Sequence, residues 1–242
     1  MEIIKVSHFY KSFAEKTVHE DVNFSVNNGE CLGLLGGSGV GKSVILRSLI
    51  GLERANSGSI RIDDEEITSF NENEFTKIRK KVAYVFQHGA LFDSMSVFDN
   101  LAYPLIEHTS LSSDEIRERV TTLLSDFNLE GSEDLLPAEL SGGMQKRVGL
   151  ARAIILNPKV VLYDEPTAGL DPANTIIIQE LILKLKKSGS TAVLVTHDID
   201  TALNVCDRIC LLRGGKIINI GSLQQFKSDK NKLVELFLKE EK

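Results

Sequence analysis

The apolar residues of this chain follow two spacings, one typical of buried strands and the other typical of helices. Short apolar runs beside turn residues predict strands, because a strand covered on both faces carries apolar side chains at successive positions. Helical stretches separate the later strands, and this alternation predicts a parallel sheet with helices on both faces. The runs lie at residues 1–6, 22–26, 31–35, 59–62, 82–86, 160–163, 192–195 and 209–212.

Helical spacing dominates the middle of the chain. An apolar stripe runs from Ile116 to Phe127, behind a Ser-Asp-Glu start at 113–115 that suits a helix cap. Further helices are predicted at about 42–50, directly after a strand, and at 144–156. The pattern therefore predicts an α/β protein in which a helical block interrupts the alternation of strands and helices.

This change of pattern suggests how one domain is divided. We expect a helical subdomain at residues 87–157, inserted into a core that is formed by residues 1–86 and 158–242. A turn of Asn-Asn-Gly at 27–29 follows the second predicted strand, 22–26. The whole chain of 242 residues is long enough for one large α/β domain.

Composition narrows the classes of function. The net charge of -6 argues against a nucleic-acid binder, which usually carries a basic face, and gives no attraction to anionic lipid headgroups. No run of about 18 apolar residues is present, so no direct membrane insertion is expected. The first residues lack a basic region followed by an apolar run, so no signal peptide is expected either. Any membrane role must come through a partner.

The cysteines and the last residues add little chemistry. Cys31, Cys206 and Cys210 are odd in number and lack metal-ligand spacing, which favours reduced core thiols in a cytosolic protein. Residues 239–242 are charged and are expected to form a frayed polar tail.

A glycine-rich loop follows the apolar run 31–35. It fits the Walker A pattern G-x-x-x-x-G-K-[ST], in which backbone N–H groups surround a polyphosphate, the lysine reaches the β- and γ-phosphates, and the hydroxyl binds Mg²⁺. An apolar strand before the loop and a helix after it are the context that this mechanism requires. The residues of the loop are Gly36, Gly37, Ser38, Gly39, Val40, Gly41, Lys42 and Ser43.

A second phosphate-binding surface is predicted about a hundred residues downstream. The hexapeptide 140–145, Leu-Ser-Gly-Gly-Met-Gln, begins the predicted helix 144–156 with small residues. A helix N-terminus carries partial positive charge and unpaired N–H donors, so it suits a terminal phosphate. Ser141, Gly142, Gly143 and Gln145 are therefore candidate ligands, and one nucleotide can be held between the two surfaces.

The apolar run 160–163 ends in two carboxylates, which fits the Walker B pattern. Asp164 is the candidate Mg²⁺ ligand, and Glu165 is the candidate to orient or deprotonate the attacking water. Many strands end in acidic turns, so this pattern gains its meaning from its position after the other motifs.

Three weaker candidates follow predicted strands or turns. Gln87 could contact Mg²⁺ or the water, and His197 could donate a hydrogen bond to the γ-phosphate. Asp171, at the end of the Ala-Gly-Leu-Asp sequence 168–171, suits a helix N-cap. Read alone, each of the three is more often structural or solvated.

Together these motifs resemble the nucleotide-binding subunit of ATP-binding cassette (ABC) transporters, in that family's order and over nearly the whole chain. The resemblance implies a RecA-like P-loop NTPase fold with an antiparallel β subdomain and a helical subdomain. It implies ATP and Mg²⁺ as cofactors, with Ser43, Gln87 and Asp164 at the metal. Glu165, His197 and Gln87 are then catalytic, Asp171 lies near the nucleotide, and Phe13 stacks on adenine, a role for which Tyr10 is a rival.

The resemblance also implies partners. Two copies would form a head-to-tail homodimer, in which Walker A of one chain and residues 141–143 of the other enclose ATP. The stretch 87–105 is similar to that of MlaF-like ATPases of Mla/Mce-type phospholipid transporters, where this region meets the membrane subunit. Its aromatic and apolar residues could dock there or could fill the helical subdomain. They are Phe92, Met95, Phe98 and Tyr103.

This narrower similarity implies an MlaE-like permease, an MCE-domain protein and a STAS-domain protein as partners, phospholipid as cargo, and a peripheral place on the cytoplasmic face of the inner membrane. An importer for amino acids or another small solute would share every catalytic motif. A soluble ABC protein without transport and a regulatory ATP-binding protein without turnover are further alternatives, and Glu165 argues against the last. The chain departs from the family pattern at two Walker A positions, since Gly37 stands where the family often has proline and Ser43 where it commonly has threonine. The chain also ends soon after Leu238, without the longer C-terminal extension of some MlaF-like proteins.

Overall fold

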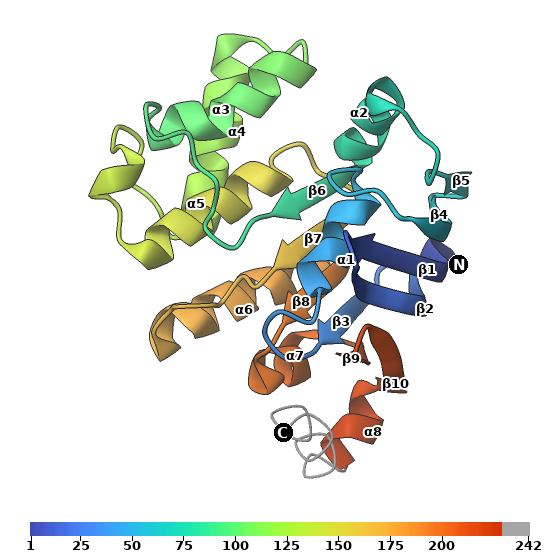
Figure 1. The fold of residues 1–242 in the computed structure, drawn as a ribbon. Coiled ribbons are helices and arrows are strands. Elements are labelled where there is room, and N and C mark those ends of the chain that lie inside the picture. Colours follow the sequence, from blue (N-terminus) through green and yellow to red (C-terminus); the bar gives the residue numbers. More distant parts are fainter. Residues whose placement is uncertain (229–242) are drawn as a thin grey trace.

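The computed structural model describes residues 1–228, so the tail predicted at 239–242 lies outside the described residues. Its larger sheet has six strands in the order β10-β9-β3-β8-β7-β6, all parallel except β10, which is antiparallel to β9. Each strand predicted for this sheet is present (Figure 1). The strands are β3 (Cys31–Leu35), β6 (Val82–Val85), β7 (Val160–Asp164), β8 (Thr191–Thr196), β9 (Arg208–Arg213) and β10 (Lys216–Ser222).

A second sheet is antiparallel and has the order β2-β1-β4-β5. The first two strands are much longer than the apolar runs predict, because both continue through polar residues and several register shifts. This sheet confirms the predicted antiparallel subdomain. Its strands are β1 (Glu2–Phe13), β2 (Lys16–Asn27), β4 (Ser57–Ile62) and β5 (Glu65–Glu66).

Helices cover both faces of the larger sheet, and three of them form a group at one end (Figure 1). That group is made of α3, α4 and α5, which fall within the predicted helical block 87–157; the boundaries of that block stay a prediction. The helices are α1 (Lys42–Leu49), α2 (Glu72–Lys81), α3 (Val97–His108), α4 (Ser113–Asp126), a 3-10 turn (Pro137–Glu139), α5 (Gly142–Ile154), α6 (Pro172–Lys187), α7 (Ile199–Val205) and α8 (Leu223–Ser228). No helix in the part that the structure describes is long and apolar enough to span a membrane.

Alternate residues of the central strands enter two different cores. On β3, Leu32 and Leu34 face α1 and the antiparallel sheet, while Cys31 and Leu35 face the opposite side. The second core continues from the sheet into the helical group, where it includes Val120 of α4. Strand side chains alternate between faces, so a strand buried on both sides must be apolar throughout. This is why the short apolar runs predict these strands so well.

Local capping explains where two of the helices begin. The cap of α4 is Ser112, one residue before the predicted start, and its hydroxyl accepts from the Glu115 N–H while the Glu115 carboxylate accepts from the Ser112 N–H. The helix α5 begins at Gly142 rather than at 144, because Ser141 caps it.

The three cysteines are buried and free, as predicted.

Candidate functional site

The glycine-rich loop joins the end of β3 to the start of α1, as its sequence predicts. Gly41, the residue before the helix, has a φ of 96°, in the left-handed region that favours glycine. A β-carbon on Gly41 would lie 2.6 Å from His19 Nε2. The same ring nitrogen of His19 donates to the Gly41 carbonyl at 3.0 Å. Only glycine fits here, and the loop therefore has a fixed path into α1.

Lys42 directs its ammonium group back over this loop. Its Nζ donates to the carbonyls of Gly36 at 2.9 Å and Gly37 at 2.8 Å, and it lies 3.3 Å from Oε1 of Glu165. The lysine is buried. A buried cation on a loop of backbone N–H groups, at the N-terminus of a helix, fits a phosphate group.

Ser43 and Asp164 form the candidate metal site. The Ser43 hydroxyl donates to Oδ1 of Asp164 at 2.6 Å, and the Tyr84 hydroxyl donates to Oδ2 at 2.7 Å. Burial and the neighbouring Asp164 raise the pKa of Tyr84, so its hydroxyl stays protonated as a donor.

The oxygen ligands of this site fit Mg²⁺. The described residues contain no group of three His, Cys, Asp or Glu side chains that could hold a metal. Mg²⁺ is usually bound through one or two protein oxygens and otherwise by water and substrate phosphates, so Ser43 and Asp164 are a sufficient protein contribution. When bound, Mg²⁺ would neutralise charge that develops on the phosphates.

Glu165 lies between Lys42 and His197. Its Oε2 is 2.9 Å from Nδ1 of His197 and accepts from the His197 backbone N–H at 3.3 Å. The φ of Glu165 is 49°, which is uncommon for a residue with a side chain, and its N–H donates to the Val195 carbonyl of β8 at 2.9 Å. Uncommon backbone conformations often occur at functional sites. A buried carboxylate held in this way can orient a water molecule or take its proton.

The second predicted phosphate surface lies at the start of α5. Ser141 caps the helix and accepts from the Met144 N–H at 3.3 Å, and both Ser141 and Gly142 are exposed. Gly143 is buried, and a β-carbon there would collide with Asn174. Asn174 in turn donates to Asp171, the N-cap of α6, at 2.6 Å. The backbone N–H of Asn174 is the main cause of the lowered pKa of Asp171.

Gln145 and Lys146 hold this helix start in place. The Gln145 side chain donates to the Pro137 carbonyl at 2.8 Å, and Lys146 donates to the Ala168 carbonyl. The Lys146 contact and the contact between Gly143 and Asn174 hold the start of α5 against the segment 168–174 of the same chain. Gln145 therefore supports the preceding turn, and its contact with a nucleotide stays a prediction.

Comparison with known proteins decides the family. The family model described as ABC transporter matches residues 19–168. The chain belongs to the ABC transporter family. It is an ABC ATPase, with ATP as its nucleotide and Mg²⁺ as its metal ion. The predicted P-loop NTPase fold is thereby confirmed.

Relatives and solved structures agree with this assignment. The chain is 42% identical to "Probable ribonucleotide transport ATP-binding protein mkl" of Mycobacterium tuberculosis over 97% of its own length and 66% of that protein. It is 40% identical to "Methionine import ATP-binding protein MetN 2" of Bacillus cereus, over 97% of its own length and 70% of that protein. A dimeric structure of the ATP-binding cassette MJ0796 with ADP and Pi matches with a TM-score of 0.84 and 33% identity, over 91% of this chain and 98% of that one. The names of these relatives concern ribonucleotides and methionine, and not phospholipids.

The other predicted ligands of the ABC ATPase lie at exposed positions. Gln87 is in a turn after β6, and both Phe13 and its rival Tyr10 are exposed on β1. The Lys11 ammonium covers the Phe13 ring at 4.5 Å from its centroid. The structure thus brings together Lys42, Ser43, Asp164, Glu165 and His197, and places Gln87, Phe13 and the start of α5 on the surface.

Three residues that shape the site of the ABC ATPase escaped the sequence analysis. Asn174 and Lys146 hold segments whose proximity depends on the tertiary fold, and no local signal identifies them. Tyr84 is different, because a parallel pairing of β6 with β7 would place Tyr84 and Asp164 on the same sheet face. That signal was available in the predicted strands.

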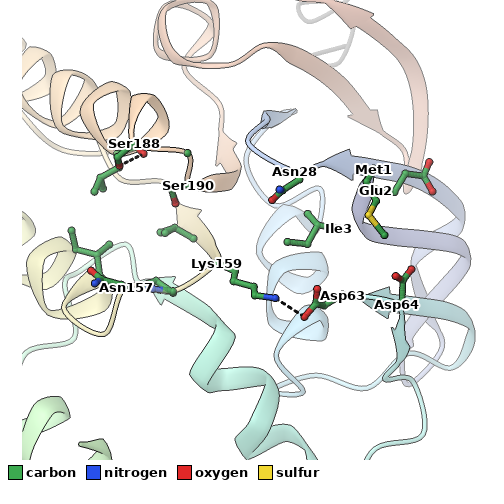
Figure 2. A pocket seen from close by; sticks show the side chains of 15 residues that line it. Met1, Glu2, Ile3, Asn28, Asp63, Asp64, Asn157, Lys159, Ser188 and Ser190 are labelled. Carbon is green, nitrogen blue, oxygen red and sulfur yellow. Dashed lines mark hydrogen bonds and ion pairs between the residues drawn. The ribbon is translucent and has the colours of Figure 1, made fainter.

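A cavity lies where the parallel strands begin, at the end of the sheet opposite the candidate ATP site. This cavity of about 570 Å³ lies at the amino ends of β1, β7 and β8 (Figure 2). Asn157, Ser188 and Ser190 line one side of it, and an ion pair between Lys159 and Asp63 at 3.0 Å crosses another. None of the predicted ATP ligands lies there.

Proposed function

We propose that this ABC ATPase is the ATP-hydrolysing subunit of a membrane transporter and works as a head-to-tail homodimer. The observation that carries this proposal is the position of the start of α5. Ser141 and Gly142 are exposed, and the contacts of Gly143 and Lys146 hold them against residues 168–174 rather than against the P-loop of the same chain. A second chain would complete the nucleotide site. The MJ0796 structures, which match with TM-scores of 0.84 and 0.85, are dimeric and support the dimer.

Within such a dimer, phosphate charge lies between two sets of donors. Lys42 and the P-loop N–H groups would face one side of the phosphates, and the N-terminus of α5 from the other chain would face the opposite side. Closure then depends on the terminal phosphate. Glu165 and His197 would position the attacking water, and loss of the terminal phosphate after hydrolysis would let the dimer open.

The docking surface that we propose for the permease lies on α3 and the loop before it. Phe92 and Tyr103 are 44% and 39% exposed, and their rings meet edge to face at 5.4 Å between centroids. Buried Asn100 holds the loop, since its amide donates to the carbonyls of Phe92 at 3.1 Å and Met95 at 3.0 Å. Aromatic side chains on a rigid loop are typical of interface anchors.

The four residues predicted for docking therefore divide into two pairs. Phe92 and Tyr103 are exposed, whereas Met95 and Phe98 are half-buried. Phe98 packs against the core that continues from the larger sheet into the helical group, and the Arg117 guanidinium lies 5.4 Å from its ring centroid. We assign docking to Phe92 and Tyr103 and assign a mainly structural role to Phe98.

Phospholipid is our proposed cargo, moved between bacterial envelope membranes. It rests on the similarity of the stretch 87–105 to MlaF-like ATPases, and it carries with it an MlaE-like permease, MCE-domain and STAS-domain partners, and a place on the cytoplasmic face of the inner membrane. The second candidate is import of an amino acid or another small solute. The names of the relatives favour that candidate, because they concern methionine import and ribonucleotide transport.

Co-purification of the chain with its native membrane partners would test the proposal. We expect the tagged wild-type chain to retain an integral membrane permease, and a Phe92→Ser, Tyr103→Ser double variant to lose it while ATP binding persists. Ile218→Ser is the matched control, because Ile218 is exposed on β10, away from α3. A retained MCE-domain protein would support the lipid cargo, and a retained solute-binding protein would support the second candidate.

A further inference from the structure

The carboxylate of Asp164 is held through both of its oxygens. Oδ1 accepts from the Ser43 hydroxyl at 2.6 Å, and Oδ2 accepts from the Tyr84 hydroxyl at 2.7 Å. Asp164 is buried, so the direction of its carboxylate is set by these two donors. Ser43 belongs to the Walker A loop, but Tyr84 belongs to none of the nucleotide-binding motifs.

Sheet pairing accounts for the reach of Tyr84. The strands β6 and β7 are parallel, and Tyr84 pairs with Leu162, two residues before Asp164. Residues two apart on a strand share a face, so the Tyr84 and Asp164 side chains leave the sheet on the same side. This is also the side that α1 covers, from which Ser43 comes.

Two neighbours restrict the Tyr84 side chain. Its ring lies 4.4 Å from that of Phe86 between centroids, and the Arg47 side chain of α1 lies near its hydroxyl. The phenol is half-buried between these groups. Its hydroxyl is therefore directed at Asp164 by groups on both β6 and α1.

We propose that Tyr84 is a positioning residue for the metal site. By holding Oδ2, it turns the carboxylate of Asp164 so that Oδ1 stays beside the Ser43 hydroxyl, and the two candidate Mg²⁺ ligands keep a fixed relation to each other. The inference rests on the proposed ATP site and adds to it a residue outside the motifs. Loss of such an outer hydrogen bond typically lowers metal affinity about 10- to 100-fold.

Tyr84→Phe tests the inference, because it removes the hydroxyl and keeps the ring. Binding of Mn²⁺ in place of Mg²⁺ can be followed by electron paramagnetic resonance in the presence of a slowly hydrolysed ATP analogue. Affinity for a fluorescent ATP analogue in EDTA reports nucleotide binding without metal. We expect Mn²⁺ affinity to fall about 10- to 100-fold in the variant and metal-free nucleotide affinity to stay unchanged.

Tyr163→Phe is the matched control. Tyr163 is the buried neighbour of Asp164 on β7, and its side chain enters the opposite core, so loss of its hydroxyl should leave Mn²⁺ affinity at the wild-type value. Wild-type Mn²⁺ affinity in Tyr84→Phe would overturn the inference. An equal loss of metal-free nucleotide binding would also overturn it, because that pattern indicates damage to the strand. A wild-type chain without nucleotide-dependent Mn²⁺ binding would refute the proposed function as well.

Discussion

The six-stranded sheet has a carboxyl edge, where its parallel strands end, and an amino edge, where they begin. Charged residues are buried at the first and more exposed at the second. At the carboxyl edge, Lys42, Glu165 and Asp164 are buried. Lys42 lies 3.3 Å from Glu165, Glu165 lies 2.9 Å from His197, and Asp164 lies 2.6 Å from the Ser43 hydroxyl. At the amino edge, Lys159 and Asp63 form an ion pair in the lining of a cavity of about 570 Å³ (Figure 2). Ligands of open α/β sheets bind outside the carboxyl ends of the strands. The amount of empty space is therefore a poor guide to function in this fold.

Burial explains why similar ion pairs have different consequences. The Lys42 side chain is 6% exposed and that of Lys159 is 59% exposed. Water screens an exposed pair, which typically contributes less than about 1 kcal/mol, whereas a buried charge that loses its partner is costly. Substitutions at the carboxyl edge should thus change chemistry, and those at the amino edge should change little.

The largest effect is expected from Lys42→Ala. The substitution removes the buried cation that faces the phosphates, and a hydrogen bond to a charged group contributes about 1.5 to 3 kcal/mol. Several such bonds are lost, so ATP affinity should fall at least about 100-fold, which isothermal titration calorimetry can measure. Unaltered affinity would refute the assignment of the P-loop.

Glu165→Gln should separate binding from hydrolysis. The amide keeps the shape of the side chain but cannot take a proton, and loss of a general base typically costs about 10²- to 10⁴-fold in rate. ATP affinity should remain, and the ATP-bound dimer should persist in size-exclusion chromatography. Turnover at the wild-type rate would show that another group activates the water.

Acid should weaken the fold through His19, beneath the P-loop. Burial lowers the pKa of His19 below its ordinary value of 6.5, so the folded chain stays unprotonated where the unfolded chain binds a proton. Stability should therefore fall as the pH drops below 6.5, by at most about 1.4 kcal/mol per pH unit from this group. Urea unfolding at pH 7 and pH 5.5 should show a smaller loss for His19→Leu than for the wild type. Equal losses would contradict this cause.

The smallest effect is expected at the amino edge. Lys159→Ala removes an exposed partner of Asp63, which keeps Lys81 at 3.1 Å. Unfolding free energy should change by less than about 1 kcal/mol, with ATPase activity unchanged. A loss of activity in a steady-state ATPase assay would show that the two edges are coupled.

Prediction from sequence succeeded where one physical signal dominates. The strand at 31–35 is a continuous apolar run, and the structure has β3 at Cys31–Leu35. In contrast, α2 buries only Phe75 and Ile78, so its apolar pattern is too sparse to predict a helix. Its capping box, Asn71 with Glu74, was the available signal. β10 was missed because it is an edge strand with exposed isoleucines.

The candidate site could be predicted in part for the same reason. The motifs locate the P-loop and the two carboxylates, since each is a short sequence with its own chemistry. The contact of Lys42 with Glu165 and the hydrogen bond of Tyr84 to Asp164 join residues about 80 to 120 positions apart, and only the order of the strands brings them together.

The central claim is that each nucleotide site needs two chains, and mixing two inactive variants tests it most directly. Lys42→Ala lacks a working P-loop, and Ser141→Arg blocks the start of α5. In a mixed dimer, the intact P-loop of the second variant would face the intact α5 of the first. The account predicts that ATPase activity returns on mixing, up to about one quarter of the wild-type rate if the two sites act independently. No recovery on mixing, or wild-type activity in Ser141→Arg alone, would contradict it.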